Sequence, residues 1–408
     1  MSKLILLLPE SIQRKLQLRK FRRIFEWAKQ NSAFYDDIYE KAGINNLNIN
    51  SFADIEKIPV VDKDLMLQTP KENLLTTPLS EDLAENSSSG STGKPMTVYA
   101  TKKDYLTSVV RTFMAIKGYN PFKRIVFIGM HEEKERNEKH TLVYYLQKYF
   151  GLFEREKYSV YMPSGEIIDK LYGREINTLS STPSIVKLLI EELKESRRIL
   201  NINYVVLSGE TVFGDLRNDI KTYLKAKVID VYGCTELLSM AWTKPDMEDF
   251  NYLPNTVFVE YVNPVEIDGE HYGELVITNL LNKTQPFVRY NIRDLVKVPV
   301  ATNRMGNIIG RIEDHIDLES GEKLHRLEFC TMYKPLKECR QFRIIKKKDK
   351  RIYFQAICKA KKEESEIKQK IIDIWEKHFL GVPLEVQFFK ELPLSSKTGK
   401  FKIIEQES

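Results

Sequence analysis

Apolar residues recur at helical spacing near the start of the chain. Between Ser11 and Gln30 the residues at this spacing are Phe21, Ile24, Phe25 and Ala28, and arginines and lysines occupy the opposite face. The pattern predicts a surface helix that packs its apolar side on a larger body. The charged side is interpreted as a solvated face rather than a nucleic-acid contact.

Short runs of β-type residues follow, and helical patterns separate several of them. The runs are 96–100, 124–130, 204–208 and 228–232, and the helical patterns are 185–194 and 215–224. Strands that alternate with helices predict an α/β layer architecture. Ligands of such folds bind where strands end in loops.

The pattern changes after Gly273. Strands are expected at 274–278 and 287–290, and a punctuated segment at 303–310 indicates a boundary near residue 310. Next come a strand at 351–358, a strand at 384–389 and, between them, a helix with one face made by Ile367, Ile371, Ile374, Trp375 and His378. The fold class expected is α/β, with a large multi-layer N-terminal α/β domain (1–309) and a small C-terminal α+β domain (310–408).

Composition narrows the class of protein. The 408 residues are 42% hydrophobic and 29% charged, which indicates a globular chain rather than a disordered one. Lys plus Arg exceed Asp plus Glu by 63 to 57, too small a surplus to indicate a nucleic-acid partner. From Arg311 onward the count is 22 basic to 17 acidic residues, so the small domain carries most of the net charge of +6.

The spacing of the cysteines and the length of the apolar stretches indicate the cellular compartment in which the protein is expected. The four cysteines lie far apart without a Cys-x-x-Cys pair, which argues against a zinc ribbon, a redox dithiol or a secreted disulfide scaffold. The apolar stretch 4–8 is shorter than a signal-peptide core, and no window resembles a membrane span. A cytoplasmic protein without a membrane span is expected. No Gly-x-Ser-x-Gly or His-Glu-x-x-His motif is present, which excludes the common serine hydrolases and zincins.

The segment 87–95, Ser-Ser-Ser-Gly-Ser-Thr-Gly-Lys-Pro, is the most informative stretch. Glycines let a backbone approach a ligand, hydroxyls and amides donate to phosphate oxygens, and lysine supplies a cation. The segment is typical of a phosphate cradle. It is not a Walker A loop, because only two residues separate its glycines and proline follows the lysine. The alternative is a flexible polar turn.

A second candidate is the segment 231–236, Val-Tyr-Gly-Cys-Thr-Glu, where an apolar strand ends. An aromatic plane, a small residue, a hydroxyl and an acid could hold a purine and a phosphate-bound magnesium ion. The alternative is an ordinary strand-to-helix turn in which Thr235 caps the helix.

Three further segments carry chemistry. In 286–294, Asp294 could accept hydrogen bonds from ribose hydroxyls, or it could form a salt bridge with Arg289 or Arg293. The segment 310–314 could be a hinge whose Arg311 reaches a ligand, or a charged linker. The segment 392–400 is a small-polar loop that ends in Lys400, or a solvated tail.

Together the five segments have the order and spacing found in the adenylate-forming superfamily, and the chain most resembles its phenylacetate-CoA ligase branch. The N-terminal segments 31–35, 41–44, 51–55 and 58–60 resemble that branch, as do 182–184 and 286–295. The segment 182–184 also has a structural interpretation, in which Thr182 is the N-cap and Pro183 lies in the first turn of the helix that follows. The likeness covers almost the whole chain. The charged run 131–140 departs from the branch where the acyl pocket forms, so phenylacetate itself is not the expected acid.

The resemblance assigns a role to each matching position. Residues facing the ATP phosphates would be Ser89, Ser91, Thr92, Gly93 and Lys94. Residues along the adenine would be Ser208, Gly209, Glu210, Tyr232 and Gly233. The remaining roles are phosphate contact for Thr235, magnesium binding for Glu236, ribose binding for Asp294, nucleotide support for Arg311 and a catalytic cation for Lys400.

The implied reaction joins a carboxylic acid to AMP with release of pyrophosphate. The small, mobile domain then rotates, and the thiol of coenzyme A or of a carrier protein displaces AMP. Two alternatives stay open: transfer to an amine or a protein cysteine, or a nucleotide-binding protein without turnover. The presence of both Glu236 and Lys400 favours an enzyme, since binding alone requires no mobile lysine. The acid, the acceptor and a monomeric or homodimeric state are not determined.

Overall fold

The computed structural model describes most of the chain as two compact units. The residues described are all except 1–3, 88–94, 106, 108–115, 117, 121–122, 130–154, 213–214, 238–240, 268, 300–303, 334, 337, 359–363, 394–400 and 408. Unit 1 comprises Met1–Glu210 and Arg217–Ile308, and unit 2 comprises Thr211–Leu216 and Ile309–Ser408. No helix of the described part is long and apolar enough to cross a bilayer.

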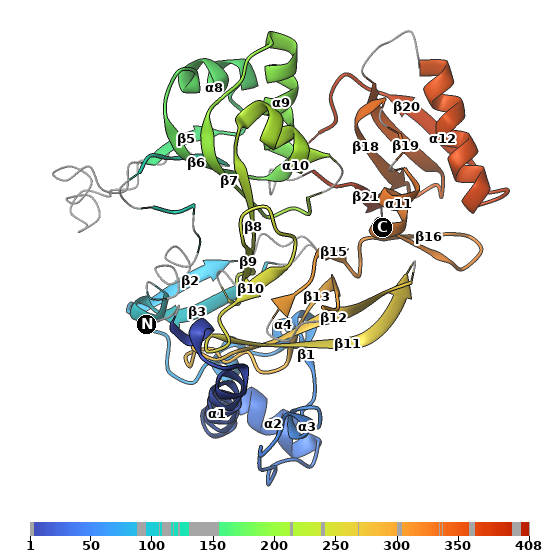
Figure 1. Cartoon of the computed structure of the whole chain (residues 1–408). Coiled ribbons are helices and arrows are strands. Elements are labelled where there is room, and N and C mark those ends of the chain that lie inside the picture. Colours follow the sequence, from blue (N-terminus) through green and yellow to red (C-terminus); the bar gives the residue numbers. More distant parts are fainter. Residues whose placement is uncertain are drawn as a thin grey trace. The chain divides into compact units, whose positions relative to one another are not determined.

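An eight-stranded sheet forms one layer of unit 1 among the described residues (Figure 1). Its order is β14 (Arg304–Met305), β10 (Phe250–Tyr252), β9 (Ala241–Thr243), β8 (Lys227–Tyr232), β7 (Ile202–Ser208), β6 (Ile176–Ser181), β4 (Ile125–Gly129) and β5 (Arg155–Ser159). The strands from β8 to β5 in this order are mutually parallel. The strands expected at 124–130, 204–208 and 228–232 are therefore confirmed, and so is the α/β class.

A second sheet and a hairpin supply further strands to the described part of unit 1. The sheet runs β1 (Val61–Asp62), β13 (Tyr290–Lys297), β12 (Glu270–Asn279) and β11 (Val257–Ile267), and the hairpin pairs β2 (Leu83–Ser87) with β3 (Thr97–Thr101). The hydrophobic core packs between this sheet and the N-terminal helices, and it includes Phe21, Phe25, Tyr39, Leu275 and Phe287. The apolar side of the helix expected at 11–30 supplies part of that core.

The helical elements of unit 1 follow the apolar pattern. They are η1 (Leu4–Leu7), α1 (Glu10–Asn31), α2 (Ala33–Lys41), α3 (Phe52–Ile55), α4 (Lys63–Gln68), α5 (Lys71–Leu74), α8 (Ser164–Leu171), α9 (Pro183–Ser196), α10 (Leu216–Asp219) and η2 (Ile220–Leu224). The expected helix 215–224 is thus divided, because Ile220 begins a π-helical turn.

The strand expected at 287–290 is wrong, because β13 begins only at Tyr290. Arg289, the residue before β13, has a left-handed backbone with a φ of 49°. Its guanidinium pairs with Glu260 at 3.0 Å and also donates to the carbonyls of Glu56 and Ile58. Arg289 therefore holds the segment before β1 against β11. Arg293, which also has a positive φ, pairs with Asp62 at 2.6 Å.

Unit 2 is an α+β module with its own core. Its elements are β15 (Ile308–Arg311), β16 (His315–Asp317), β17 (Lys323–His325), α11 (Arg326–Met332), β18 (Cys339–Lys346), β19 (Ile352–Cys358), α12 (Glu364–His378), β20 (Leu384–Phe388) and β21 (Ile404–Gln406). The sheet order is β20-β19-β18-β21. Ile367, Ile371 and Trp375 of α12 are buried in the core of this unit, as the helical pattern predicts.

Candidate active site

The carboxyl ends of β7 and β8 lie next to each other. The two strands are parallel, and Ser208 pairs in register with Val231. A glycine follows each strand, and Gly209 has a φ of 82°, where a side chain would be strained. The structure therefore brings Ser208 and Gly209 to the same sheet edge as Tyr232 and Gly233, as the sequence predicts.

Glu210 has a structural role at this edge. Its carboxylate accepts hydrogen bonds from the Ser184 amide and the Ser184 hydroxyl, both at 2.9 Å. These bonds cap the N-terminus of α9, where a carboxylate is favoured by exposed N–H groups. Pro183 is the first helical residue as expected, but the Thr182 side chain makes no cap hydrogen bond. The cap comes instead from a residue 26 positions further along the chain.

Tyr232 and Asp294 join the two sheets of unit 1. The Tyr232 hydroxyl donates to Oδ2 of Asp294 at 2.5 Å. Burial and the Asp294 carboxylate raise the pKa of Tyr232 well above its ordinary value, so the phenol stays protonated and remains a donor. Asp294 lies inside β13 rather than after a strand, on the buried face that also carries Tyr290 and Ile292. The Tyr232 hydroxyl satisfies one oxygen of this buried carboxylate.

Glu236 is held by two residues that sequence reasoning did not select. The Tyr290 hydroxyl donates to Oε1 of Glu236 at 2.9 Å, and the Asn279 side chain donates to the Glu236 carbonyl at 3.0 Å. Tyr290 and Asn279 are both buried. Tyr290 lies in the segment 286–294, but nothing in its local pattern indicates a partner 54 residues earlier.

Cys234 lies between these groups and is not activated. Burial raises the pKa of its thiol well above the ordinary value, and the Glu236 carboxylate adds to the rise. A thiol in this state is a poor nucleophile. Acyl transfer to a cysteine of the chain therefore gains no support at this position.

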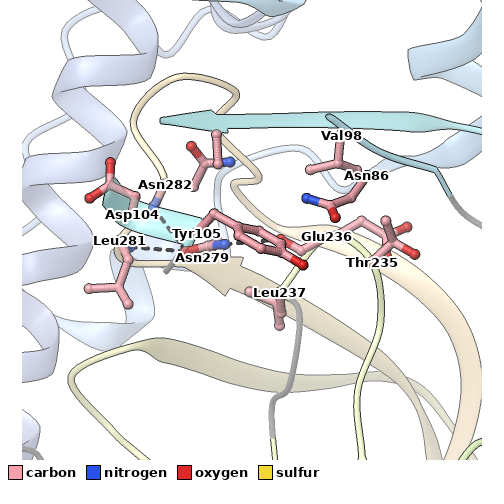
Figure 2. Close-up of a pocket in the computed structure, with 11 residues that line it drawn as sticks. Asn86, Val98, Asp104, Tyr105, Thr235, Glu236, Leu237, Asn279, Leu281 and Asn282 are labelled. Atoms are coloured by element: carbon pink, nitrogen blue, oxygen red, sulfur yellow. Dashed lines mark hydrogen bonds between the residues drawn. The ribbon is translucent and has the colours of Figure 1, made fainter. Parts of the chain in front are cut away.

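A pocket opens beside Thr235 and Glu236 (Figure 2). Asn86 of β2 and Val98 of β3 line it with them, together with Asp104, Tyr105 and residues of the turn after β12. In the sequence, the Ser-Gly segment 87–95 starts at the end of β2 and precedes β3. The two paired strands that flank this segment therefore lie at the pocket that Thr235 and Glu236 line.

The residues at the pocket fit a magnesium ion that arrives with phosphates. Among the described residues, no group of three or more His, Cys, Asp or Glu side chains could hold a metal ion. Mg²⁺ is commonly bound by one or two carboxylates together with phosphate oxygens and water. Glu236 supplies one oriented carboxylate at the pocket wall, which is the donor set that such an ion requires.

The other predicted residues divide into two groups. Ser89, Ser91, Thr92, Gly93, Lys94 and Lys400 lie outside the described residues. Arg311 ends β15, and its amide donates to Oδ2 of Asp314 at 3.3 Å. Asp314 also lies 3.7 Å from Arg326, so the segment 310–314 is an ordered turn within unit 2 rather than a plain linker.

Asp230 lies in β8, the strand that carries Tyr232, and its burial can be tested through the pH dependence of stability. Burial raises the pKa of Asp230 to about 7, although Arg217 at 3.7 Å opposes the rise. The proton is bound more tightly in the folded protein, so the stabilisation is complete below the unfolded pKa and is lost as pH rises through about 7. The free energy of unfolding should therefore fall by about 2 kcal/mol between pH 5.5 and 8 through this residue.

Asp230→Asn should remove this part of the pH dependence, as measured by urea unfolding at the two pH values. Asp169→Asn is the control, because Asp169 also pairs with an arginine but lies at the surface. An unchanged pH slope in Asp230→Asn would show that Asp230 is already ionised at low pH.

Comparison with known proteins gives the chain its class. No family model matches it. It is 26% identical over 337 residues to the phenylacetate-coenzyme A ligase of Thermus thermophilus, covering 75% of this chain and 72% of that protein. It is 25% identical over 321 residues to the Escherichia coli enzyme of that name, covering 73% and 71%. It is 24% identical over 328 residues to the protein CapK of Staphylococcus aureus, covering 76% and 70%.

Solved structures share the fold. The 2-hydroxyisobutyryl-CoA ligase in the postadenylation state matches with a TM-score of 0.73 at 16% identity, over 98% of this chain and 90% of that one. The ATP-bound MatB of Rhodopseudomonas palustris matches with a TM-score of 0.53 at 16% identity, over 79% and 67%. The chain is an adenylate-forming ligase. Within that superfamily its sequence is similar to the phenylacetate-CoA ligase-like branch.

Proposed function

We propose that the chain activates a small carboxylic acid with ATP and transfers the acyl group to the thiol of coenzyme A. A carboxylate oxygen of the acid attacks the α-phosphorus of ATP, the bond to pyrophosphate breaks, and an acyl adenylate forms. The thiol sulfur then attacks the acyl carbonyl, and AMP leaves with the electrons of the broken bond. Coenzyme A is the proposed acceptor because the relatives from Thermus thermophilus and Escherichia coli are named as coenzyme A ligases. A carrier-protein thiol has the same chemistry.

The observation that carries the proposal is the convergence of separate motifs through two tyrosine–carboxylate hydrogen bonds. Tyr232 and Glu236 come from the end of β8, whereas Asp294 and Tyr290 come from β13. A merely structural turn after β8 requires no such pair of oriented carboxylates. One carboxylate suits ribose hydroxyls and the other suits a cation bound to phosphates.

The proposed division of labour follows from charge. Joining an acid to a triphosphate brings anions together, so catalysis is chiefly placement and charge neutralisation. Mg²⁺ supplies positive charge to the phosphates when it is bound. Asp294 would fix the ribose, Thr235 would donate to a phosphate oxygen, and Lys400 would neutralise the reacting carboxylate and α-phosphate. The two domains, 1–309 and 310–408, would move relative to each other between the two steps.

A pyrophosphate-release assay with a panel of aliphatic, hydroxylated and aromatic carboxylic acids tests this function. Release should require ATP, Mg²⁺ and one class of acid, and hydroxylamine should trap the activated acyl group as a hydroxamate. Addition of coenzyme A should then convert the adenylate to a thioester. If no acid stimulates release while ATP still binds, the chain is a nucleotide-binding protein without turnover.

Replacing Tyr290 with Phe removes the hydroxyl that orients Glu236. We expect the Mg²⁺ concentration for half-maximal pyrophosphate release to rise by about tenfold, because loss of a partner that orients a metal-binding carboxylate weakens metal binding by about 10- to 100-fold. The maximal rate at saturating Mg²⁺ should change less. Tyr261→Phe is the control, since the Tyr261 hydroxyl donates to the Arg304 carbonyl instead. A lower rate at every Mg²⁺ concentration would contradict the positioning role.

A further inference from the structure

The first half of α1 has an inverted polarity. Gln13 and Gln17 face the protein and are 8% and 3% exposed, whereas Ile12 and Leu16 face solvent and are 43% and 36% exposed. The Gln17 amide donates to the Val257 carbonyl at 2.9 Å, so its burial is satisfied. In the second half of α1 the ordinary polarity returns, with Phe21, Ile24, Phe25 and Ala28 buried. A surface helix normally places its apolar residues inward throughout.

More exposed apolar side chains precede α1 directly. Leu7 is 79% exposed, and Leu6 and Leu8 are also exposed. Ile12 and Leu16 are four residues apart and therefore neighbours on the helix surface. We define the N-terminal apolar face as Leu7, Leu8, Ile12 and Leu16. Single exposed apolar residues are common, but a cluster of this kind marks a contact with a protein or a membrane.

Basic residues continue the same face of α1. Lys15, Arg19 and Arg23 are exposed, and they lie three, seven and eleven positions after Ile12, on the same side of the helix. Basic residues on other sides of α1 bind backbone carbonyls, as Lys20 does with Asn255 and Arg22 with Ile49. The helix holds seven basic and two acidic residues, a net charge of +5.

We propose that the N-terminal apolar face and its basic extension bind the surface of an anionic lipid membrane. Apolar side chains of a helix that lies on a bilayer enter the boundary between headgroups and acyl chains, and lysines and arginines bind the anionic headgroups. The exposed leucines and Ile12 would enter the boundary between headgroups and acyl chains. Lys15, Arg19 and Arg23 would bind the anionic headgroups. The contact is peripheral, since no helix of the described part could span a membrane.

Charge argues against a second copy of the chain as the occupant. A two-fold interface pairs the same surface with itself, so Arg19 and Arg23 of one copy would approach the like charges of the other. An anionic bilayer instead offers negative charge next to an apolar layer. The proposal is independent of the reaction proposed above, because no residue of α1 lines the pocket beside Glu236.

Sedimentation of the full chain with vesicles tests the proposal. Vesicles of equimolar phosphatidylcholine and phosphatidylglycerol should bind it at least about tenfold more tightly than phosphatidylcholine alone. Raising the salt from about 50 mM to about 500 mM should weaken binding, because screening shortens the reach of the charges. Absence of binding to the anionic vesicles at low salt would overturn the proposal.

Two variants locate the contact. Leu7→Ser/Ile12→Ser/Leu16→Ser and Lys15→Gln/Arg19→Gln/Arg23→Gln should each lower vesicle affinity by about tenfold or more. Leu188→Ser/Ile199→Ser/Leu380→Ser is the matched control, because these side chains are also exposed. Pyrophosphate release by each soluble variant should remain at the level of the parent chain.

If the control and both variants bind vesicles equally well, the membrane contact does not lie on the N-terminal apolar face or its basic extension. Light scattering measures the oligomeric state of the parent chain and of the variant with serine at positions 7, 12 and 16. A dimer that the serine variant converts to a monomer would show that the face joins two copies of the chain, and it would also overturn the proposal.

Discussion

Lys400→Ala is expected to slow acyl-adenylate formation by about 10²- to 10³-fold while ATP affinity stays nearly unchanged. Loss of one preorganised group that stabilises transition-state charge has effects of this size. A group that acts mainly in the transition state contributes little to ground-state binding. Pyrophosphate release gives the rate, and equilibrium binding of ATP gives the affinity.

Two controls isolate the role of Lys400. Lys402→Ala removes a neighbouring exposed lysine, which lies 3.5 Å from Glu405, and should leave the rate unchanged. Thioester formation from a supplied acyl adenylate should be retained in Lys400→Ala, because the lysine is proposed to act only in the first step. Equal adenylation by Lys400→Ala and the parent chain would remove the proposed mechanism.

Glu236→Gln is expected to lower adenylation by about 10²-fold at low Mg²⁺. The amide keeps the size of the side chain and an oxygen that can accept from Tyr290, but it loses the charge that a hard cation requires. Thermal stability should therefore change little. Pyrophosphate release measured over a range of Mg²⁺ concentrations checks the result, and high Mg²⁺ should recover part of the rate.

Glu270→Gln supplies the matched control for this variant. Glu270 pairs with Lys297 at the surface, 2.8 Å away, so its neutralisation changes the net charge equally without touching the pocket. A loss in Glu236→Gln that is independent of Mg²⁺ would argue that the carboxylate does not serve a cation.

The sequence predicted those parts of the site that lie within one segment. The strands that end at Ser208 and Tyr232 are apolar runs followed by glycine, and this local pattern suffices to place them at one sheet edge. The motif order identified the superfamily. The helix α9 was predicted from its apolar spacing and its first proline.

Contacts between distant segments could not be predicted in the same way. The bonds from Tyr232 to Asp294 and from Tyr290 to Glu236 depend on how two sheets pack, which no local period encodes. The cap of α9 by Glu210 was missed for the same reason, since a threonine stood at the expected position. The strand expected at 287–290 was wrong because β13 begins at Tyr290, and neither the positive φ of Arg289 nor its buried pair with Glu260 is indicated by the local pattern.

The single strand β13 carries both tyrosine–carboxylate contacts. Tyr290 and Asp294 are both buried in it, but the strand is irregular between them, because its register with β12 shifts between Glu274 and Val276 and Arg293 has a φ of 65°. An irregularity of this kind re-aims the side chains that follow it, so this stretch sets the direction in which Asp294 meets Tyr232. Making this stretch a regular strand should therefore disturb the contact of Asp294 with Tyr232 more than the contact of Tyr290 with Glu236.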